Sequence, residues 1–144
     1  MLFRSQITLG QLETSEKSNE ITAIPELLET LDISGSTVTI DAMGCQKQIA
    51  EKICGKGADY IFGLKANQPT LLHDVKLYFE TEVIEKQTDT LEKDHGRIEK
   101  REYYLETNID WLPYRSEWKN LNGIGMVKSS VTSTKTGEFT QESR

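Results

Sequence analysis

The sequence lacks any run of 18 or more apolar residues, so no membrane-spanning helix is expected. Near the N-terminus, Arg4, Ser5 and Gln6 interrupt the unbroken apolar stretch that a secretory signal peptide needs. These absences exclude a membrane partner and predict a soluble, cytoplasmic protein.

The sequence is also poor in the motifs of several enzyme classes. Its two cysteines, Cys45 and Cys54, form neither a CxxC pair nor a disulfide framework, and buried free thiols are expected. The glycines never form GxGxxG or GxxxxGK, which excludes the common nucleotide-binding loops, and no zinc or calcium spacing is present. With only His73 and His95 and no convincing nucleophile elbow, a hydrolytic triad has little support.

The hydrophobic content and the net charge limit the expected core and the expected contact with DNA. The 144 residues suit one domain, but only 36% are hydrophobic, so the core is expected to be thin. The net charge of -6 repels phosphate, and any contact with DNA must therefore come from a local basic patch.

The first half of the chain is predicted to be α/β. A weak alternation suggests a short strand over 7–12, and apolar spacing predicts a helix from Ser18 or Asn19 to about Asp32, in which Pro25 is tolerable only near the first turn. A strand over 37–42, a helix over 46–55 and a strand over 60–64 then form a βαβ unit, which favours parallel pairing.

The second half is expected to be richer in strands. A helix should begin near Pro69, with a polar tail to Lys86, and a loop should follow over 87–94. Strands are predicted over 97–105, over 124–133 and from 138 to the end, with an aromatic turn or short helix over 111–118.

Asp41 is the most informative residue. It ends a predicted strand, and open α/β sheets bind ligands outside the carboxyl ends of their strands, so Asp41 is a candidate metal ligand. The alternative is structural, because Asp41 could cap the turn into the next helix.

Lys65, Asn67 and Gln68 follow the next strand and should share the rim that carries Asp41. They are candidates for DNA contact, with Lys65 on a phosphate. A structural alternative is open here too, because Asn67 is a suitable cap for the helix at Pro69 and an exposed lysine needs no function.

A third candidate segment spans His95 to Arg101. It carries four potential cations, and on a strand Arg97 and Arg101 would share one face while Lys100 points to the other. Arginines suit phosphate oxygens, so His95, Arg97, Lys100 and Arg101 are candidate DNA contacts. The alternative is an edge strand guarded by charge.

Four motifs occur in one order along the chain: KSNEI at 17–21, TIDAMGCQ at 39–46, KANQ at 65–68 and HGRIE at 95–99. Together they closely resemble the transposases of H-repeat-associated insertion sequences, which belong to the DDE superfamily. The resemblance spans most of the chain.

The resemblance implies a ribonuclease H-like catalytic domain, in which a mixed sheet is flanked by helices and carries two aspartates and one glutamate. Residues 1–86 would form part of this core, and 87–144 a β-rich inserted part of the same domain. Asp41 would be the second acid, a ligand of two Mg²⁺ or Mn²⁺ ions that promote phosphoryl transfer on DNA at the transposon ends.

The resemblance also implies incompleteness. The first acid lies upstream in the family and the third downstream, and Glu99 does not correspond to either. We therefore expect an internal piece without activity of its own, whose N-terminal strand repacks or pairs with a second copy in a homo-oligomer. Two alternatives are a regulator that binds DNA or an intact transposase, and a non-functional remnant.

Overall fold

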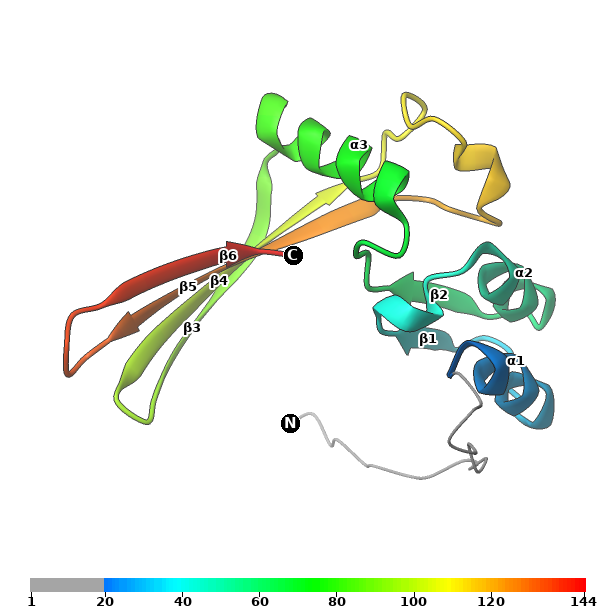
Figure 1. Ribbon diagram of the computed structural model, residues 1–144, viewed down its shortest axis with the longest axis horizontal. Helices are drawn as coiled ribbons and strands as arrows, with labels where there is room; N and C mark the ends of the chain where they lie inside the picture. Colours follow the sequence, from blue (N-terminus) through cyan, green and yellow to red (C-terminus); the bar gives the residue numbers. More distant parts are fainter. Residues whose placement is uncertain (1–19) are drawn as a thin grey trace. The chain divides into compact units, whose positions relative to one another are not determined.

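The structure is a computed structural model that describes residues 20–144 (Figure 1). The strand expected over 7–12 and the helix start expected at Ser18 or Asn19 lie outside the described residues. The chain divides into two compact units, Met1–Gln68 with Ser116–Asn120, and Pro69–Arg115 with Leu121–Arg144. Each unit contains its own sheet.

The first unit contains the predicted βαβ arrangement. Helix α1 (Glu20–Thr30) precedes strand β1 (Thr37–Ile40), and the 3-10 helix η1 (Ala42–Gly44), helix α2 (Lys47–Gly55) and strand β2 (Asp59–Phe62) follow. Strands β1 and β2 pair in parallel, from Thr37 opposite Asp59 to Ile40 opposite Phe62. The parallel pairing expected from the sequence is therefore confirmed.

Apolar side chains from both helices and both strands form the core of this unit. Ile49 and Ile53 on α2 are almost completely buried, and they pack with Leu28 on α1. Alternate positions of each strand, such as Val38 and Tyr60, face this cluster because side chains alternate across a strand. One face of the two-stranded sheet is thereby buried.

Helix α1 differs from expectation at Pro25. The proline lies inside the helix, at its sixth residue, and not in the first turn. A proline at this depth removes one backbone hydrogen bond and crowds the preceding turn. Burial of Leu28 against α2 and the strands stabilises the helix in spite of that cost.

The second unit is a helix followed by a four-stranded antiparallel sheet. Helix α3 (Pro69–Thr81) leads into β3 (Lys86–Asp94), β4 (Arg97–Glu106), β5 (Ile124–Ser133) and β6 (Phe139–Ser143), which pair in that order. The 3-10 helix η2 (Arg115–Glu117) confirms the short helix expected within 111–118.

One expectation about this sheet, and one alternative that the sequence left open, are wrong. Residues 87–94 belong to β3 and are not a loop, because their backbone pairs with β4 although every β3 side chain is exposed. Strand β4 is not an edge strand either, because it pairs with β3 on one side and β5 on the other. The polar composition of β3 concealed a strand that backbone pairing holds in place.

Aromatic contacts fix α3 within the second unit. Tyr78 stacks on Trp111 with ring centroids 4.1 Å apart, and its hydroxyl donates to a carboxylate oxygen of Glu106 at 3.0 Å. Ile109 and Leu112 in the same loop are buried. The loop between β4 and β5 is therefore packed structure, as the aromatic cluster in the sequence indicated.

The fold is α/β, with three α-helices and two sheets in the described part of the chain. The two sheets, one parallel and one antiparallel, are separate, so the ribonuclease H-like mixed sheet stays a prediction, as does the expected boundary at residue 86. None of the helices within 20–144 combines the length and the apolar character needed to cross a membrane.

Candidate active site

Asp41 lies directly after β1, at the carboxyl end of the parallel strand pair, and is exposed. It is the N-cap of η1, where its Oδ1 accepts a hydrogen bond from the Met43 backbone N–H at 3.2 Å. Among residues 20–144, no donor contacts its second carboxylate oxygen. The cap and a metal-ligating role are therefore compatible, since the cap uses one oxygen and leaves the other exposed.

Two glycines bring the backbone around Asp41 into close contact. Gly44 is buried at the end of η1, where an added Cβ would lie 2.1 Å from Cγ2 of Ile40. Gly63 follows β2, and a Cβ there would lie 3.3 Å from the Ala42 nitrogen and 3.5 Å from the Asp41 carbonyl carbon. The turn that carries Asp41 is thus packed against the strand before it and the loop after β2.

Asn67 and Gln68 reach this same turn. The Asn67 side-chain amide donates to the Ala42 carbonyl, and the Gln68 amide donates to the Cys45 carbonyl at 2.9 Å. The structure thus brings two sequence motifs together as predicted, but through contacts within the protein. Among the described residues, the Asn67 side chain bonds to Ala42 and not to the backbone of α3, so its alternative role as a cap of that helix is not supported. Lys65 in the same loop is exposed, and no ion pair involves it among the described residues.

The cations of β4 are paired with carboxylates. Lys100 Nζ lies 2.9 Å from Glu102, and Arg101 lies 2.8 Å from Glu99. Partial desolvation raises the pKa of Glu99, but a hydrogen bond from Ser129 and the charge of Arg101 outweigh it, so the pKa is lowered. These pairs reduce the positive potential that the sequence suggested.

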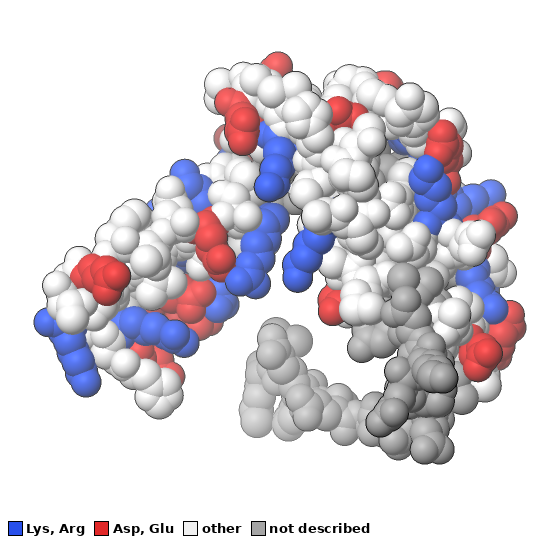
Figure 2. All heavy atoms as spheres, viewed as in Figure 1, with Lys and Arg blue, Asp and Glu red and all other residues white. Residues whose placement is uncertain are grey.

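The register confirms that Arg101 and Lys100 lie on opposite faces of the sheet, because they are adjacent positions of one strand. Figure 2 shows blue and red side chains side by side over the β-rich unit on the face in view. Arg97, at the start of β4, has no ion pair within 20–144, although its charge contributes to the lowered pKa of Glu99.

His95 lies in the two-residue turn between β3 and β4, with a φ of 48°. The Asp94 carboxylate accepts its backbone N–H at 2.8 Å and lies 3.1 Å from its Nε2. The side chain is 86% exposed, and Asp94 is its only charged contact among the described residues. The contacts of His95 within the described part of the chain therefore belong to the turn, and its expected contact with DNA stays a prediction.

The described residues do not form a complete metal centre. No group of three or more His, Cys, Asp or Glu side chains within residues 20–144 converges as metal ligands would. Carboxylate oxygens suit Mg²⁺ and Mn²⁺, so Asp41 fits as one ligand. A pair of ions needs several carboxylates, and these residues alone do not supply them.

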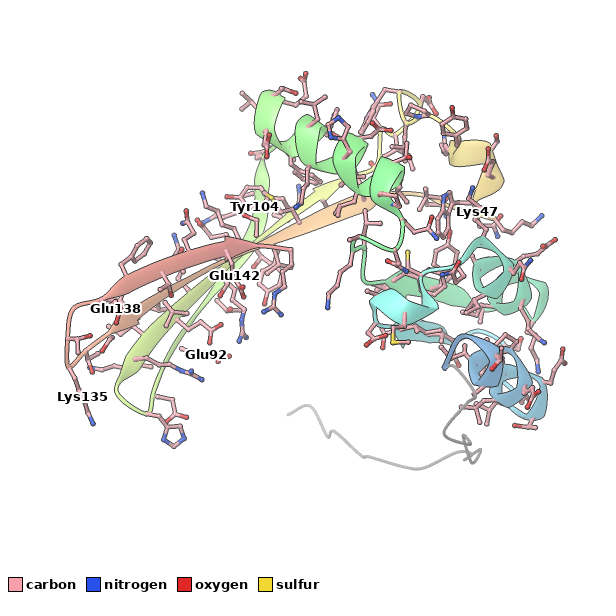
Figure 3. The ribbon with its side chains drawn as sticks, viewed as in Figure 1. Lys47, Glu92, Tyr104, Lys135, Glu138 and Glu142 are labelled. Atoms are coloured by element: carbon pink, nitrogen blue, oxygen red, sulfur yellow. The ribbon has the colours of Figure 1, made fainter. Side chains whose placement is uncertain are left out.

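The sequence did not indicate how the segment Ser116–Asn120 is held in the first unit. The Tyr60 hydroxyl donates to the Lys119 carbonyl at 2.9 Å. Lys47 on α2, labelled in Figure 3, forms an ion pair with Glu117. Trp118 is buried, with Lys47 Nζ 6.0 Å from its ring centroid. The sequence indicated that Trp118 belongs to an aromatic cluster, but it did not indicate that Lys47 would lie beside it.

Comparison with known proteins places the chain in a family. A family model described as "Transposase DDE domain" matches residues 2–141. The protein "H repeat-associated putative transposase YhhI" of Escherichia coli (strain K12) is 45% identical over 128 residues, which are 85% of this chain and 34% of the relative. "Uncharacterized protein in dhlA 3'region" of Xanthobacter autotrophicus is 43% identical over 128 residues, 87% of this chain and 43% of the relative.

A third relative, "Putative transposase YncI" of Escherichia coli O157:H7, is 45% identical over 129 residues, 85% of this chain and 33% of the relative. The chain thus spans between 33% and 43% of the length of these curated relatives. No solved structure is significantly similar to it. The family model covers almost the whole chain, so the resemblance found in the motifs is confirmed, and the chain belongs to the transposase DDE domain family.

Proposed function

We propose that the chain forms part of the ribonuclease H-like catalytic domain of a transposase, with Asp41 as the second of its three metal-binding acids. The observation that carries this proposal is the exposed Asp41 carboxylate at the carboxyl end of a parallel strand pair, with one oxygen that accepts no hydrogen bond from residues 20–144. Ligands bind at such strand ends in open α/β sheets. DDE transposases generally use divalent metal ions.

The 144 residues by themselves are proposed to be catalytically incomplete. Two-metal phosphoryl transfer needs ions held on both sides of the reacting phosphate by several carboxylates. Asp41 supplies one, and residues 20–144 contain no cluster that supplies the others. No catalytic step is therefore assigned to this chain alone.

An assay of DNA nicking tests this proposal. The purified 144-residue chain is incubated with supercoiled DNA and Mg²⁺ or Mn²⁺, beside Asp41→Asn as the matched control, which keeps the size of the side chain. We expect no nicking above background from either protein. Robust nicking that requires both the metal and Asp41 would refute the proposed incompleteness.

Contact with DNA is proposed to come from cations that form no ion pair with a carboxylate. Lys65, beside the Asp41 turn, and Arg97, at the start of β4, meet that condition within the described part of the chain. Lys100 and Arg101 do not, because Glu102 and Glu99 pair with them. Any DNA binding by this acidic chain should be weak and should depend strongly on salt.

Fluorescence anisotropy with a labelled duplex tests the DNA contact. Two phosphate contacts give a salt slope of about -1.8, so affinity should fall roughly twelvefold between about 50 and 200 mM salt. Arg97→Gln should reduce the slope by about 0.9, whereas Lys100→Gln, the matched control on the same strand, should leave it nearly unchanged. A salt-independent affinity, or equal effects of the two variants, would contradict this proposal.

A further inference from the structure

The orientation of Asp41 depends on a short turn. Its carboxylate accepts from Met43, two residues along, so the direction of the side chain follows the path of η1. The turn itself has few backbone bonds: Gly44 N–H donates to the Asp41 carbonyl at 3.1 Å, and Cys45 N–H to the Ala42 carbonyl at 3.2 Å. A 3-10 turn of this length has poor hydrogen-bond geometry and is weakly held by itself.

Side chains from the loop after β2 supply the missing support. Asn67 donates to the carbonyl of Ala42, the first residue of η1, and Gln68 donates to the carbonyl of Cys45, just beyond its end. The two amides therefore hold both ends of the turn. A backbone bond from Gly63 N–H to the Ile40 carbonyl at 3.0 Å keeps the supporting loop in register with β1.

We propose that Asn67 and Gln68 are positioning residues for the Asp41 carboxylate, acting through the carbonyls of Ala42 and Cys45. This inference rests on the proposed function, in which Asp41 binds a metal ion. Each amide spends one N–H donor on the protein backbone and keeps its oxygen, so the DNA contact that the sequence suggested for the two amides stays a prediction. Within the described residues, no hydrogen bond or ion pair holds the Lys65 side chain, which can therefore meet a phosphate.

The two amides can change metal affinity because they fix the backbone turn that orients the Asp41 carboxylate. A metal ion selects among carboxylate positions, and groups that orient a ligand without contacting the ion commonly change metal affinity 10–100-fold. Asn67 and Gln68 act one bond further away, through the backbone of the turn. Loss of either amide should therefore weaken binding at Asp41 by about 3–10-fold while the fold is retained.

Paramagnetic relaxation by Mn²⁺ provides a direct readout of this effect. In the ¹⁵N-labelled 144-residue chain, Mn²⁺ at Asp41 should broaden the amide signal of Met43, whose N–H contacts the carboxylate. The titration is repeated on Asn67→Ala and Gln68→Leu, with Ser36→Ala, an exposed and uncharged position of the same unit, as the matched control and Asp41→Asn as the control without the ligand. Amide signals of residues in α2 report whether each variant is folded.

The outcomes separate the inference from the proposed function. We expect the wild type and Ser36→Ala to show equal broadening, Asp41→Asn to show none, and the two amide variants to need about 3–10-fold more Mn²⁺ for the same effect. If the wild type and Asp41→Asn respond alike, the proposed metal ligand is wrong. If Asp41 binds Mn²⁺ but a folded Asn67→Ala or Gln68→Leu chain titrates like the wild type, the positioning role is refuted.

Discussion

Replacing Gly44 with alanine should destabilise the first unit through a clash that the structure makes explicit. The new Cβ would lie 2.1 Å from Cγ2 of Ile40 and 3.1 Å from Cδ1 of Ile24. Both isoleucines pack against the core cluster, so they have little room to move. Overpacking of this kind typically costs 1–3 kcal/mol, and the short distance to a rigid β-branched side chain places Gly44→Ala at about 2 kcal/mol or more.

Urea unfolding measures this change. Trp118 is buried in the first unit, so its fluorescence reports on that unit when the other tryptophan, Trp111, is replaced by phenylalanine in every protein compared. Gly55→Ala is the matched control, because a Cβ at Gly55, the last residue of α2, meets nothing within 4 Å. The control should be neutral, or more stable by up to about 1 kcal/mol.

A double-mutant cycle tests the assigned cause. Ile40→Leu moves the branch away from Cβ and so removes the Cγ2 atom that the new methyl group would meet. Adding Gly44→Ala to Ile40→Leu should therefore cost at least about 1 kcal/mol less than adding it to the wild type. The packing argument is refuted if Gly44→Ala is as stable as the wild type, or if the effects of the two substitutions are strictly additive.

Two further predictions concern side chains whose pKa is raised by burial. Burial raises the pKa of Tyr60 to about 12. The stability that the protonated tyrosine contributes is therefore present below its unfolded pKa near 10 and is lost as the pH rises toward the folded value. Urea midpoints measured between about pH 9 and 11.5 should show this loss, and Tyr60→Phe should remove it. Burial also raises the pKa of the Cys45 thiol to about 11, whereas the Cys54 thiol is only partly buried. An aromatic disulfide reagent at pH 8 should therefore modify Cys54 before Cys45, and equal rates of modification in the folded chain would contradict this prediction.

The sequence predicted best those elements whose side chains are at least partly buried. Strand β5 matches its expected range, and β1, α2 and β2 agree within about two residues at each end. The reason is that a buried face imposes its period on the residue types, as in α2, where Ile49, Ala50 and Ile53 turn inward together. The parallel pairing followed from the spacing of these elements alone.

Strand β3 had no such signal. All nine of its residues, Lys86–Asp94, have exposed side chains, so neither face selects apolar residues. Backbone hydrogen bonds to β4 hold it, and these depend on a partner and not on residue type. A local pattern therefore could not distinguish this strand from a loop.

The contacts of the candidate site were also predictable only in part. The strand ends placed Asp41 near Asn67 and Gln68 correctly, because parallel strands share a rim. Which group each amide would bond was not predictable, since the acceptors are backbone carbonyls whose positions depend on the turn. For Lys100 and Arg101 a signal was present: each has a glutamate two residues away on the same face of β4, and those glutamates are the observed partners.

The motifs that identify the family thus serve different physical purposes. The segment around Asp41 and the segment around Asn67 hold each other by hydrogen bonds, and together they orient one carboxylate. The segment at His95 is explained by its turn: His95 and Gly96 have φ values of 48° and 77°, the pair of positive values that a tight two-residue hairpin requires. The chemistry proposed for this chain therefore depends on the turn after β1, where Asn67 and Gln68 hold the backbone that carries the exposed Asp41 carboxylate.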